Sequence, residues 1–145
     1  MFTFKIEGLE DVDKVLTEIA PSKARNLIRS TVHGYIARIT KLAKQTVKKQ
    51  TGTLKKAIKT KRLKSSPDKP NSAVFVTHGK SVKNDAWYWR FVEYGTSGKT
   101  AQEARPFIRV SAQKIQTNKI EIMREEFSLK LQKVIAKELK KRRKN

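Results

Sequence analysis

The sequence lacks cysteine and has only two histidines, and it contains no apolar run long enough to span a bilayer. Without cysteine there can be no disulfide and no thiolate nucleophile, and the commonest structural zinc ligands are missing. The first residues also lack the basic and apolar regions of a signal peptide. We therefore expect a protein kept in a reducing cytoplasm, without a metal, a cofactor, a small-molecule substrate or a membrane contact.

Acidic residues are scarce and unevenly placed. The chain has 34 Lys and Arg but only 13 Asp and Glu, for a net charge of +21. Residues 1–20 hold five of the acids, whereas no acid occurs between Glu18 and Asp68, a stretch that carries fourteen bases. A charge of this size attracts polyanions and acidic protein surfaces, so partners of those two kinds are expected.

The length and the even spread of apolar residues predict one globular domain over residues 1–145. At the start of the chain, apolar and polar residues alternate over residues 2–6, which predicts a short strand. An amphipathic helix is expected over residues 9–20. A longer helix is expected over residues 22–49, because its apolar positions recur at about 100° per residue.

Two strands are expected next, over residues 54–63 and 73–77. The Ser, Pro, Asp and Asn residues between them, over residues 65–71, have the composition of an exposed hairpin loop. These two strands are the predicted sheet.

The C-terminal half predicts a short aromatic helix, a loop and a long helix. Asp85 is expected to cap the short helix and Gly95 to end it, before a loop over residues 96–103. Pro106 fits the first turn of the last helix, which is expected to run uninterrupted to a basic, frayed end at about residues 137–145. The expected fold class is α+β, a small antiparallel sheet packed by a long helix from the N-terminal half and a long C-terminal helix.

One segment resembles the end of a phosphate-binding loop, Gly95-Thr96-Ser97-Gly98-Lys99-Thr100. The full pattern requires a glycine where this chain has Glu93, and a carboxylate there would oppose the phosphate charge. The preceding segment also has the pattern of an aromatic helix, whereas a phosphate loop follows a buried strand. We expect no nucleotide site.

Other catalytic chemistry is equally unsupported. Nucleophilic catalysis requires a hydroxyl beside an oriented base, and neither His33 nor His78 has an evident partner. Glu125 and Glu126 are neighbours in sequence and face different directions on a helix, so they are expected to be solvated charges. We expect no catalytic residue and no enzyme activity.

The face of the long helix opposite its apolar stripe carries small residues, namely Ser30, Gly34 and Ala37. A glycine within a helix costs about 1 kcal/mol relative to alanine. It is interpreted either as a close approach of another backbone, such as a neighbouring subunit, or as an incidental surface glycine.

The second half of that face and the following hairpin are basic. A contact with DNA and a contact with an acidic protein are both open for the nine residues Lys41, Lys44, Lys48, Lys55, Lys56, Lys59, Lys61, Arg62 and Lys64.

Aromatic residues concentrate in the segment Trp87–Tyr94, which holds both tryptophans. As a nucleic-acid surface it would stack bases on its rings and hold phosphates with Lys83 and Arg90. As a structural segment it would anchor the short helix in the core and leave an amphipathic rim for a protein partner, which is the interpretation we favour.

Two motifs carry a family resemblance. Tyr88-Trp89-Arg90-Phe91-Val92-Glu93-Tyr94-Gly95-Thr96-Ser97, followed by Ala104-Arg105-Pro106-Phe107-Ile108-Arg109, resembles the signature of the lambdoid-phage tail-component family, the tail-completion or neck proteins of long-tailed phages. Weaker similarities are the opening Gly8-Leu9-Glu10 and the turn Thr51-Gly52-Thr53-Leu54-Lys55. The chain departs from the pattern at Val110, where the family usually has proline.

The resemblance implies a small α+β subunit of a ring between the capsid portal and the tail tube, without enzyme activity. The partners it implies are identical copies of this chain, in a homo-oligomeric ring, and other phage neck and tail proteins. The implied motif and interface residues are Trp89, Phe91, Val92, Glu93, Tyr94, Gly95, Thr96, Arg105, Pro106 and Phe107.

Two functions follow from these observations. The first is a structural assembly protein of a phage or prophage, made in the bacterial cytoplasm and then part of the virion tail or neck. The second is a free basic domain that binds nucleic acid without sequence preference. Self-association would distinguish the first from the second.

Overall fold

The computed structural model describes residues 21–47, 52–64, 66 and 69–144. The strand expected over residues 2–6, the helix expected over residues 9–20 and the predicted contact residue Lys48 lie outside the described residues. The elements in chain order are α2 (Pro21–Thr46), α3 (Thr53–Ala57), β1 (Ile58–Arg62), β2 (Ser72–Val76), α4 (Trp89–Tyr94), α5 (Ile108–Thr117) and α6 (Lys119–Arg142).

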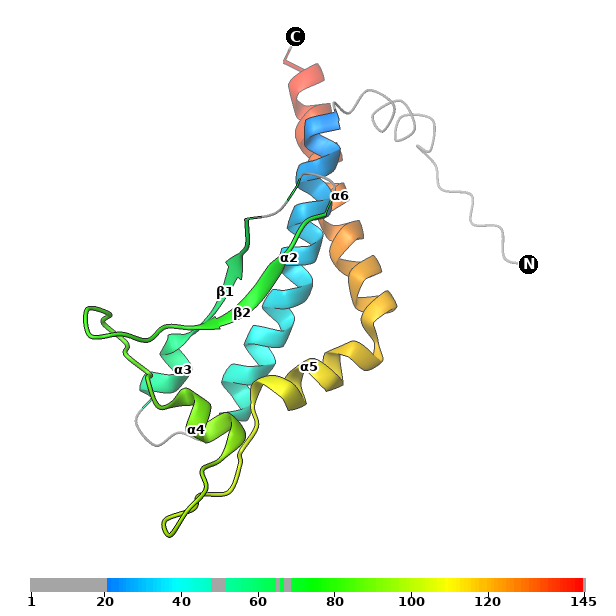
Figure 1. Ribbon diagram of the computed structural model, residues 1–145. Coiled ribbons are helices and arrows are strands. Elements are labelled where there is room, and N and C mark those ends of the chain that lie inside the picture. Colours follow the sequence, from blue (N-terminus) through cyan, green and yellow to red (C-terminus); the bar gives the residue numbers. More distant parts are fainter. Residues whose placement is uncertain (1–20, 48–51, 65, 67–68, 145) are drawn as a thin grey trace.

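Helix α2 is the axis of the described structure (Figure 1). The β1–β2 hairpin packs along one side of it, and α5 and α6 pack against it as well. Helix α5 crosses near the end of α2 that carries its last residues, while α6 runs back beside the first half of α2 (Figure 1). The predicted α+β fold, a small antiparallel sheet packed by two long helices, is confirmed.

The hairpin has one buried and one exposed face. Strands β1 and β2 are antiparallel, with Ile58 opposite Val76 and Lys59 opposite Phe75. Because side chains alternate along a strand, Ile58 and Val76 are buried while Lys59 and Phe75 face outward. On the inner face, the hydroxyl of Thr60 donates to the hydroxyl of Thr40 in α2 over 2.8 Å. The inner face is thus tied to α2 by apolar and polar contacts.

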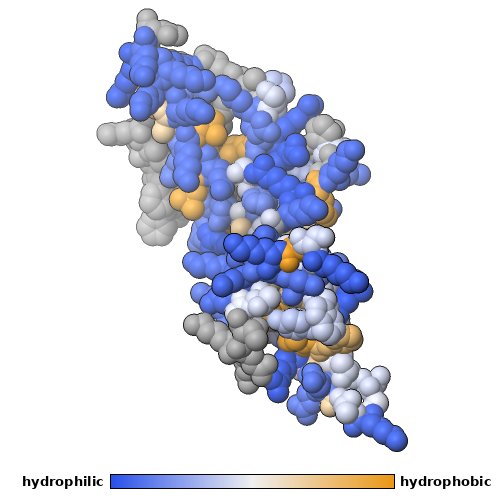
Figure 2. Space-filling model, turned by 90° about the vertical axis from the view of Figure 1, so that its left-hand side faces the viewer, coloured by the Kyte–Doolittle hydropathy of each residue, from blue (hydrophilic) through white to orange (hydrophobic). Residues whose placement is uncertain are grey.

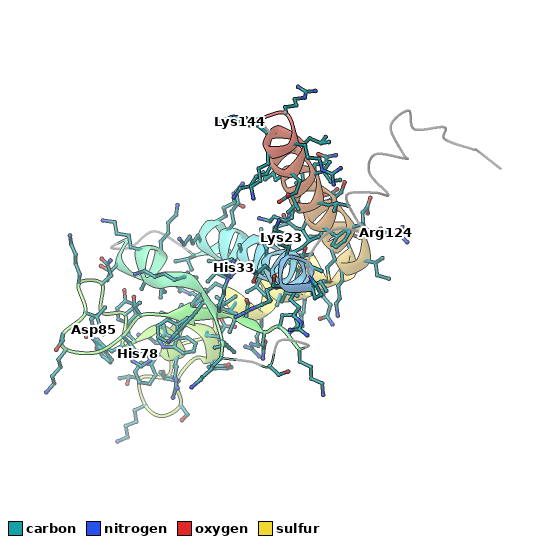
Figure 3. All side chains as sticks on the ribbon, turned by 90° about the horizontal axis from the view of Figure 1, so that it is seen from above. Lys23, His33, His78, Asp85, Arg124 and Lys144 are labelled. Atoms are coloured by element: carbon teal, nitrogen blue, oxygen red, sulfur yellow. The ribbon has the colours of Figure 1, made fainter. Side chains whose placement is uncertain are left out.

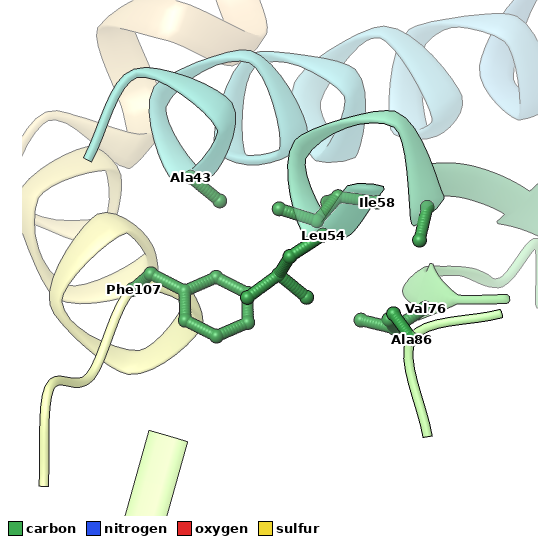
Figure 4. Packing of buried hydrophobic residues seen from close by; sticks show 7 residues of the cluster. Ala43, Leu54, Ile58, Val76, Ala86 and Phe107 are labelled. Carbon is green, nitrogen blue, oxygen red and sulfur yellow. The ribbon is translucent and has the colours of Figure 1, made fainter. Parts of the chain in front are cut away.

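The core lies where the last turns of α2 meet α3, the sheet and the start of α5. Its buried members come from five different parts of the chain (Figure 4) and are Ala43, Leu54, Ala57, Ile58, Val76, Ala86 and Phe107. Phe107 is the largest of them and is 1% exposed. Burial of a side chain of this size contributes about 1.5–3 kcal/mol, so Phe107 anchors the C-terminal half to the rest of the domain.

The first predicted strand begins too early in the sequence. Residues 53–57 form α3, and only Ile58–Arg62 form the strand. Leu54 and Ala57 are three residues apart and both buried, which is a helical period. Gly52 starts this turn with φ of 71°, a left-handed conformation that favours glycine.

The predicted uninterrupted C-terminal helix is wrong in two respects. It begins at Ile108, two residues after Pro106, and it breaks at Asn118, where φ is −112° and ψ is 31°. Thr117 and Asn118 are weak helix formers, and the break redirects the chain so that α6 packs along α2 (Figure 1). No described residue of α6 is fully buried, so its apolar stripe is only partly covered.

Two predicted helix ends also differ. Helix α2 ends at Thr46, earlier than residue 49. Asp85 does not cap α4, which starts at Trp89; its Oδ1 instead accepts the N–H groups of Gly79 at 2.9 Å and Trp87 at 3.1 Å. Asp85 therefore shapes the turn before α4. Gly95 ends α4 as predicted, with φ of 76°.

Candidate functional site

The centre of the candidate site is the buried carboxylate of Glu93, at the end of α4. Its side chain is 1% exposed. One carboxylate oxygen accepts the N–H groups of Phe107 at 2.7 Å and Ile108 at 3.0 Å, and the other accepts the N–H of Arg109 at 2.9 Å. These donors begin α5, and the N-cap residue itself makes no side-chain cap. Glu93 thus supplies from another helix both the acceptors and the negative charge that a helix N-terminus favours.

Arg109 completes the surroundings of the buried carboxylate. Its Nε lies 3.4 Å from Glu93 Oε1, and its Nη2 donates to the backbone carbonyl of Glu93 over 3.1 Å. The guanidinium also lies 5.0 Å from the centre of the Tyr94 ring. A buried charge is tolerated when it is paired and hydrogen-bonded, and Glu93 meets both conditions.

Backbone contacts join the two motif segments into one unit. The N–H of Arg105 donates to Val92 O over 2.8 Å, and the N–H of Thr96 donates to Gln102 O over 3.0 Å. The Thr96 hydroxyl in turn accepts the N–H of Gln102 at 2.9 Å. A Cβ at Gly95 would lie 2.7 Å from Gln102 O, so glycine is needed there for space as well as for its positive φ.

The two parts of the signature therefore act together to join the end of α4 to the start of α5. The first, which ends α4, supplies the acceptors and the glycine, and the second supplies the donors and inserts Phe107 into the core. The sequence placed Glu93 in the family motif and argued against a phosphate loop, but it did not reveal the role of Glu93 as a cap. The available signal was an isolated acid in a basic chain, at the end of an aromatic helix and shortly before the start of another helix.

The aromatic segment divides into a packed side and an exposed side. Tyr88, Trp89 and Val92 pack against the core. Trp87, Phe91 and Tyr94 are 65%, 47% and 60% exposed, and we call these three residues the α4 aromatic surface. The rings of Trp87 and Phe91 meet edge to face, with centroids 6.0 Å apart.

The small-residue face of α2 is covered by α6 of the same chain. Ser30, Gly34 and Ala37 are half-buried, and a Cβ at Gly34 would overlap the carboxylate of Glu126. The close neighbour of Gly34 is therefore a side chain within the domain.

Glu125 and Glu126 were predicted to be solvated charges; Glu125 is 54% exposed, but the prediction is wrong for Glu126, which is 12% exposed, and both bind Arg38 of α2. Arg38 Nε lies 2.7 Å from Glu126 and its Nη1 lies 2.9 Å from Glu125. The hydrogen bond that Arg38 donates to Glu126 is the largest influence on the pKa of Arg38 and raises it. A further ion pair joins Lys23 of α2 to Glu138 near the last turns of α6, and its hydrogen bond lowers the pKa of Glu138. Ion pairs at two places along α6 thus hold it against α2.

The two histidines lie apart, His33 on α2 and His78 after β2 (Figure 3). His33 Nδ1 is buried and makes no hydrogen bond to any described residue. Burial lowers the pKa of His33, and the charges of Arg62 and Lys130 lower it further. The ring of His78 lies 6.2 Å from that of Phe75.

The predicted basic residues are distributed over three elements. Lys41 and Lys44 lie on α2, Lys55 and Lys56 on α3, and Lys59, Lys61 and Arg62 on β1, with Lys64 just after it. Lys59 and Lys61 point outward from the sheet, since they alternate with the inward residues Ile58 and Thr60. The set therefore covers several surfaces.

The loop that carries Lys99 is exposed at the end of the domain, beyond α4. Among the described residues there is no group of three or more His, Asp or Glu side chains that could hold a metal ion. No helix in the described ranges is long and apolar enough to cross a membrane.

The sequence was compared with known proteins. The model of the family described as "Bacteriophage HK97-gp10, putative tail-component" matches residues 10–95, more than half of the chain. The match includes Glu93 and Gly95 and ends before Phe107, whose N–H donates to Glu93, and before Gln102 and Ala104, which lie close to Gly95. No curated protein and no solved structure matches the chain. The resemblance stated above is confirmed: the chain belongs to the HK97-gp10-like family of bacteriophage tail components.

Proposed function

We propose that the protein is a tail-completion or head-tail joining component that forms a closed ring in the virion neck. Family membership supports a structural role in a bacteriophage tail. Closed rings arise when one contact between two different surfaces of the subunit repeats. The proposal therefore requires two distinct surfaces.

The observation that carries the proposal is the α4 aromatic surface. Large aromatic side chains are enriched at the centres of protein interfaces, where they contribute most of the binding energy. Trp87, Phe91 and Tyr94 leave such rings in solvent, although the neighbouring Trp89 is packed. The Glu93 cap fixes the end of α4 against α5, so that little conformational entropy is lost when a partner binds.

A second apolar surface lies on α6, at a different place in the fold (Figure 1). Ile120 and Phe127, seven residues apart on one face of α6, are 71% and 40% exposed. The face of the molecule in Figure 2 is mostly hydrophilic, with small groups of hydrophobic residues within it. An α4 aromatic surface that meets α6 of the next copy would give the unlike contact that a ring needs.

The partners and the location follow from this proposal. Copies of the chain would meet each other and other neck and tail proteins, in the bacterial cytoplasm during assembly and then in the virion. The second candidate is a free basic nucleic-acid-binding domain, and the observation that favours it is the net charge of +21.

The test is disruption of the gene in a phage or prophage that produces particles. Electron microscopy of the lysate should show filled heads and separate tails, because the joint between them is incomplete. Wild-type protein supplied in trans should restore joined particles, whereas the variant Trp87→Ser/Phe91→Ser should not.

The matched control is Val82→Ser, which removes an exposed apolar side chain from the loop before α4. This variant should restore joined particles. Normal particles without any copy of the gene would contradict the proposal.

A further inference from the structure

The outer face of the β1–β2 hairpin carries cations and one aromatic ring. Lys59 and Lys61 alternate with inward residues, so both stand on this face, about 7 Å apart along the strand. Phe75 lies opposite Lys59 and is 38% exposed. We define these three residues as the hairpin outer face, and we propose that it binds the phosphate backbone of double-stranded DNA without reading the bases.

The charged residues of the two strands are of one sign. Between residues 19 and 84 the sequence contains a single acid, Asp68, and neither β1 nor β2 contains one. Further lysines flank β1 along the chain, at Lys55 and Lys56 in α3 before it and at Lys64 after it. The salt bridges among the described residues involve other cations, those of α2, α5 and α6. The hairpin lysines are therefore not neutralised by carboxylates of the described chain.

The side chains of the face favour a uniform polyanion over an acidic protein. A protein partner of useful affinity needs an apolar centre that can be desolvated. The large apolar side chains here are Phe75, opposite Lys59, and Leu63, just beyond the far end of β1, so they do not form one apolar centre. The ammonium of Lys61 lies 5.1 Å from the centre of the Phe75 ring. Phosphates need only cations within reach, and a two-stranded ribbon is narrow enough to lie along a groove of B-form DNA.

The same chemistry explains why no sequence preference is expected. Lysine binds phosphate as a compact point charge on a flexible stem, and it lacks the rigid planar fork of donors with which arginine makes bidentate contacts. Lys59 and Lys61 are the polar groups at the centre of the face. Their contacts would position the duplex without discriminating between base pairs.

DNA binding by this face does not depend on ring formation. The hairpin outer face is separate from the α4 aromatic surface and from α6 (Figure 1). A variant that cannot assemble should therefore still bind DNA, and a variant that cannot bind DNA should still assemble. Failure of one proposal would leave the other standing.

The experiment is a fluorescence-anisotropy titration of the full chain with mixed-sequence DNA duplexes over a salt series. Each neutralised phosphate adds about 0.9 to the slope of log affinity against log salt. The variant Lys59→Gln/Lys61→Gln should flatten the slope by about two phosphates' worth. The control Lys114→Gln/Lys119→Gln removes the same charge from exposed positions of α5 and α6 and should leave the slope unchanged.

Two further arms separate the alternatives. Trp87→Ser/Phe91→Ser should bind DNA with the wild-type slope, whether or not it assembles. Polyglutamate of matched length should compete weakly with the duplex. The proposal would be overturned by equal slopes for the two lysine variants or by strong preference for one base sequence. Competition by polyglutamate as strong as that by DNA would also overturn it, and would assign the face to an acidic protein.

Discussion

Replacement of Glu93 is the most informative perturbation of the fold. In Glu93→Gln the side chain keeps its size but has one acceptor oxygen in place of two, and its amide must face at least one backbone N–H that needs an acceptor. The interaction of Arg109 with a negative charge is lost as well. A buried donor left without its partner costs about 1–3 kcal/mol.

We therefore expect Glu93→Gln to lower the free energy of unfolding by about 1–3 kcal/mol. Glu93→Ala removes both acceptor oxygens, so that three backbone N–H groups lose their partner, and it opens space beside the core; about 3–5 kcal/mol is expected. The measurement is urea denaturation followed by tryptophan fluorescence, since Trp89 packs against the core near Glu93.

The matched control is Glu103→Gln, which makes the same change at an exposed position of the adjoining loop. Its effect should stay within about 0.5 kcal/mol, as for ordinary surface substitutions. The account of the cap would be refuted by a Glu93→Gln variant whose unfolding free energy matches that of this control.

Four other experiments have defined outcomes. Trp89→Ala should cost about 3 kcal/mol, because the ring packs against the core, whereas Trp87→Ala should leave the urea midpoint almost unchanged; similar midpoints for the two would contradict the division of the aromatic segment. Gly34→Leu should collide with Glu126 and loosen α6, at a cost of about 1–3 kcal/mol, and an unchanged melting temperature by circular dichroism would show that α6 does not pack there. The folded state lowers the pKa of His33, so the unfolded chain binds the proton more readily and the free energy of unfolding should fall as pH drops below about 6.5. His33→Gln should weaken this dependence in urea titrations at pH 7.5 and 5.5. Identical pH dependence of the variant and the wild type would contradict it. Wild type and Lys99→Ala should both give no heat with magnesium-ATP in calorimetry, and binding that the substitution abolishes would restore the phosphate-loop interpretation.

The elements with a strong local pattern could be predicted from the sequence. The apolar stripe of α2 extends over many turns, and β2 is a short apolar run of β-branched and aromatic residues next to a turn-rich segment, so both were located to within a few residues. Residues 54–63 were assigned wholly to a strand because Leu54, Ala57 and Ile58 fit a helical turn and a strand almost equally well. The break at Asn118 was missed because the apolar positions of α5 and α6 continue one periodic pattern, and the gain from packing α6 on α2 is a tertiary effect.

The site shows a similar limit. The sequence revealed which residues make up the motif but not which contacts they form, since Glu93 and its donors are separated by a loop and meet only in the fold. Arg38 and its two carboxylates are farther apart still in sequence, and nothing local links them. Long-range polar contacts of this kind depend on the orientation of whole helices, which a pattern along one chain does not contain.

The central claim is that copies of this chain form a closed ring. Light scattering gives the mass of the particle in solution, and negative-stain images of the same sample give its shape. We predict a mass that is a fixed multiple of 16.7 kDa and ring-shaped particles, both lost in Trp87→Ser/Phe91→Ser. The mass of one chain at every concentration, together with DNA binding by that monomer, would contradict the ring and support the free nucleic-acid-binding domain.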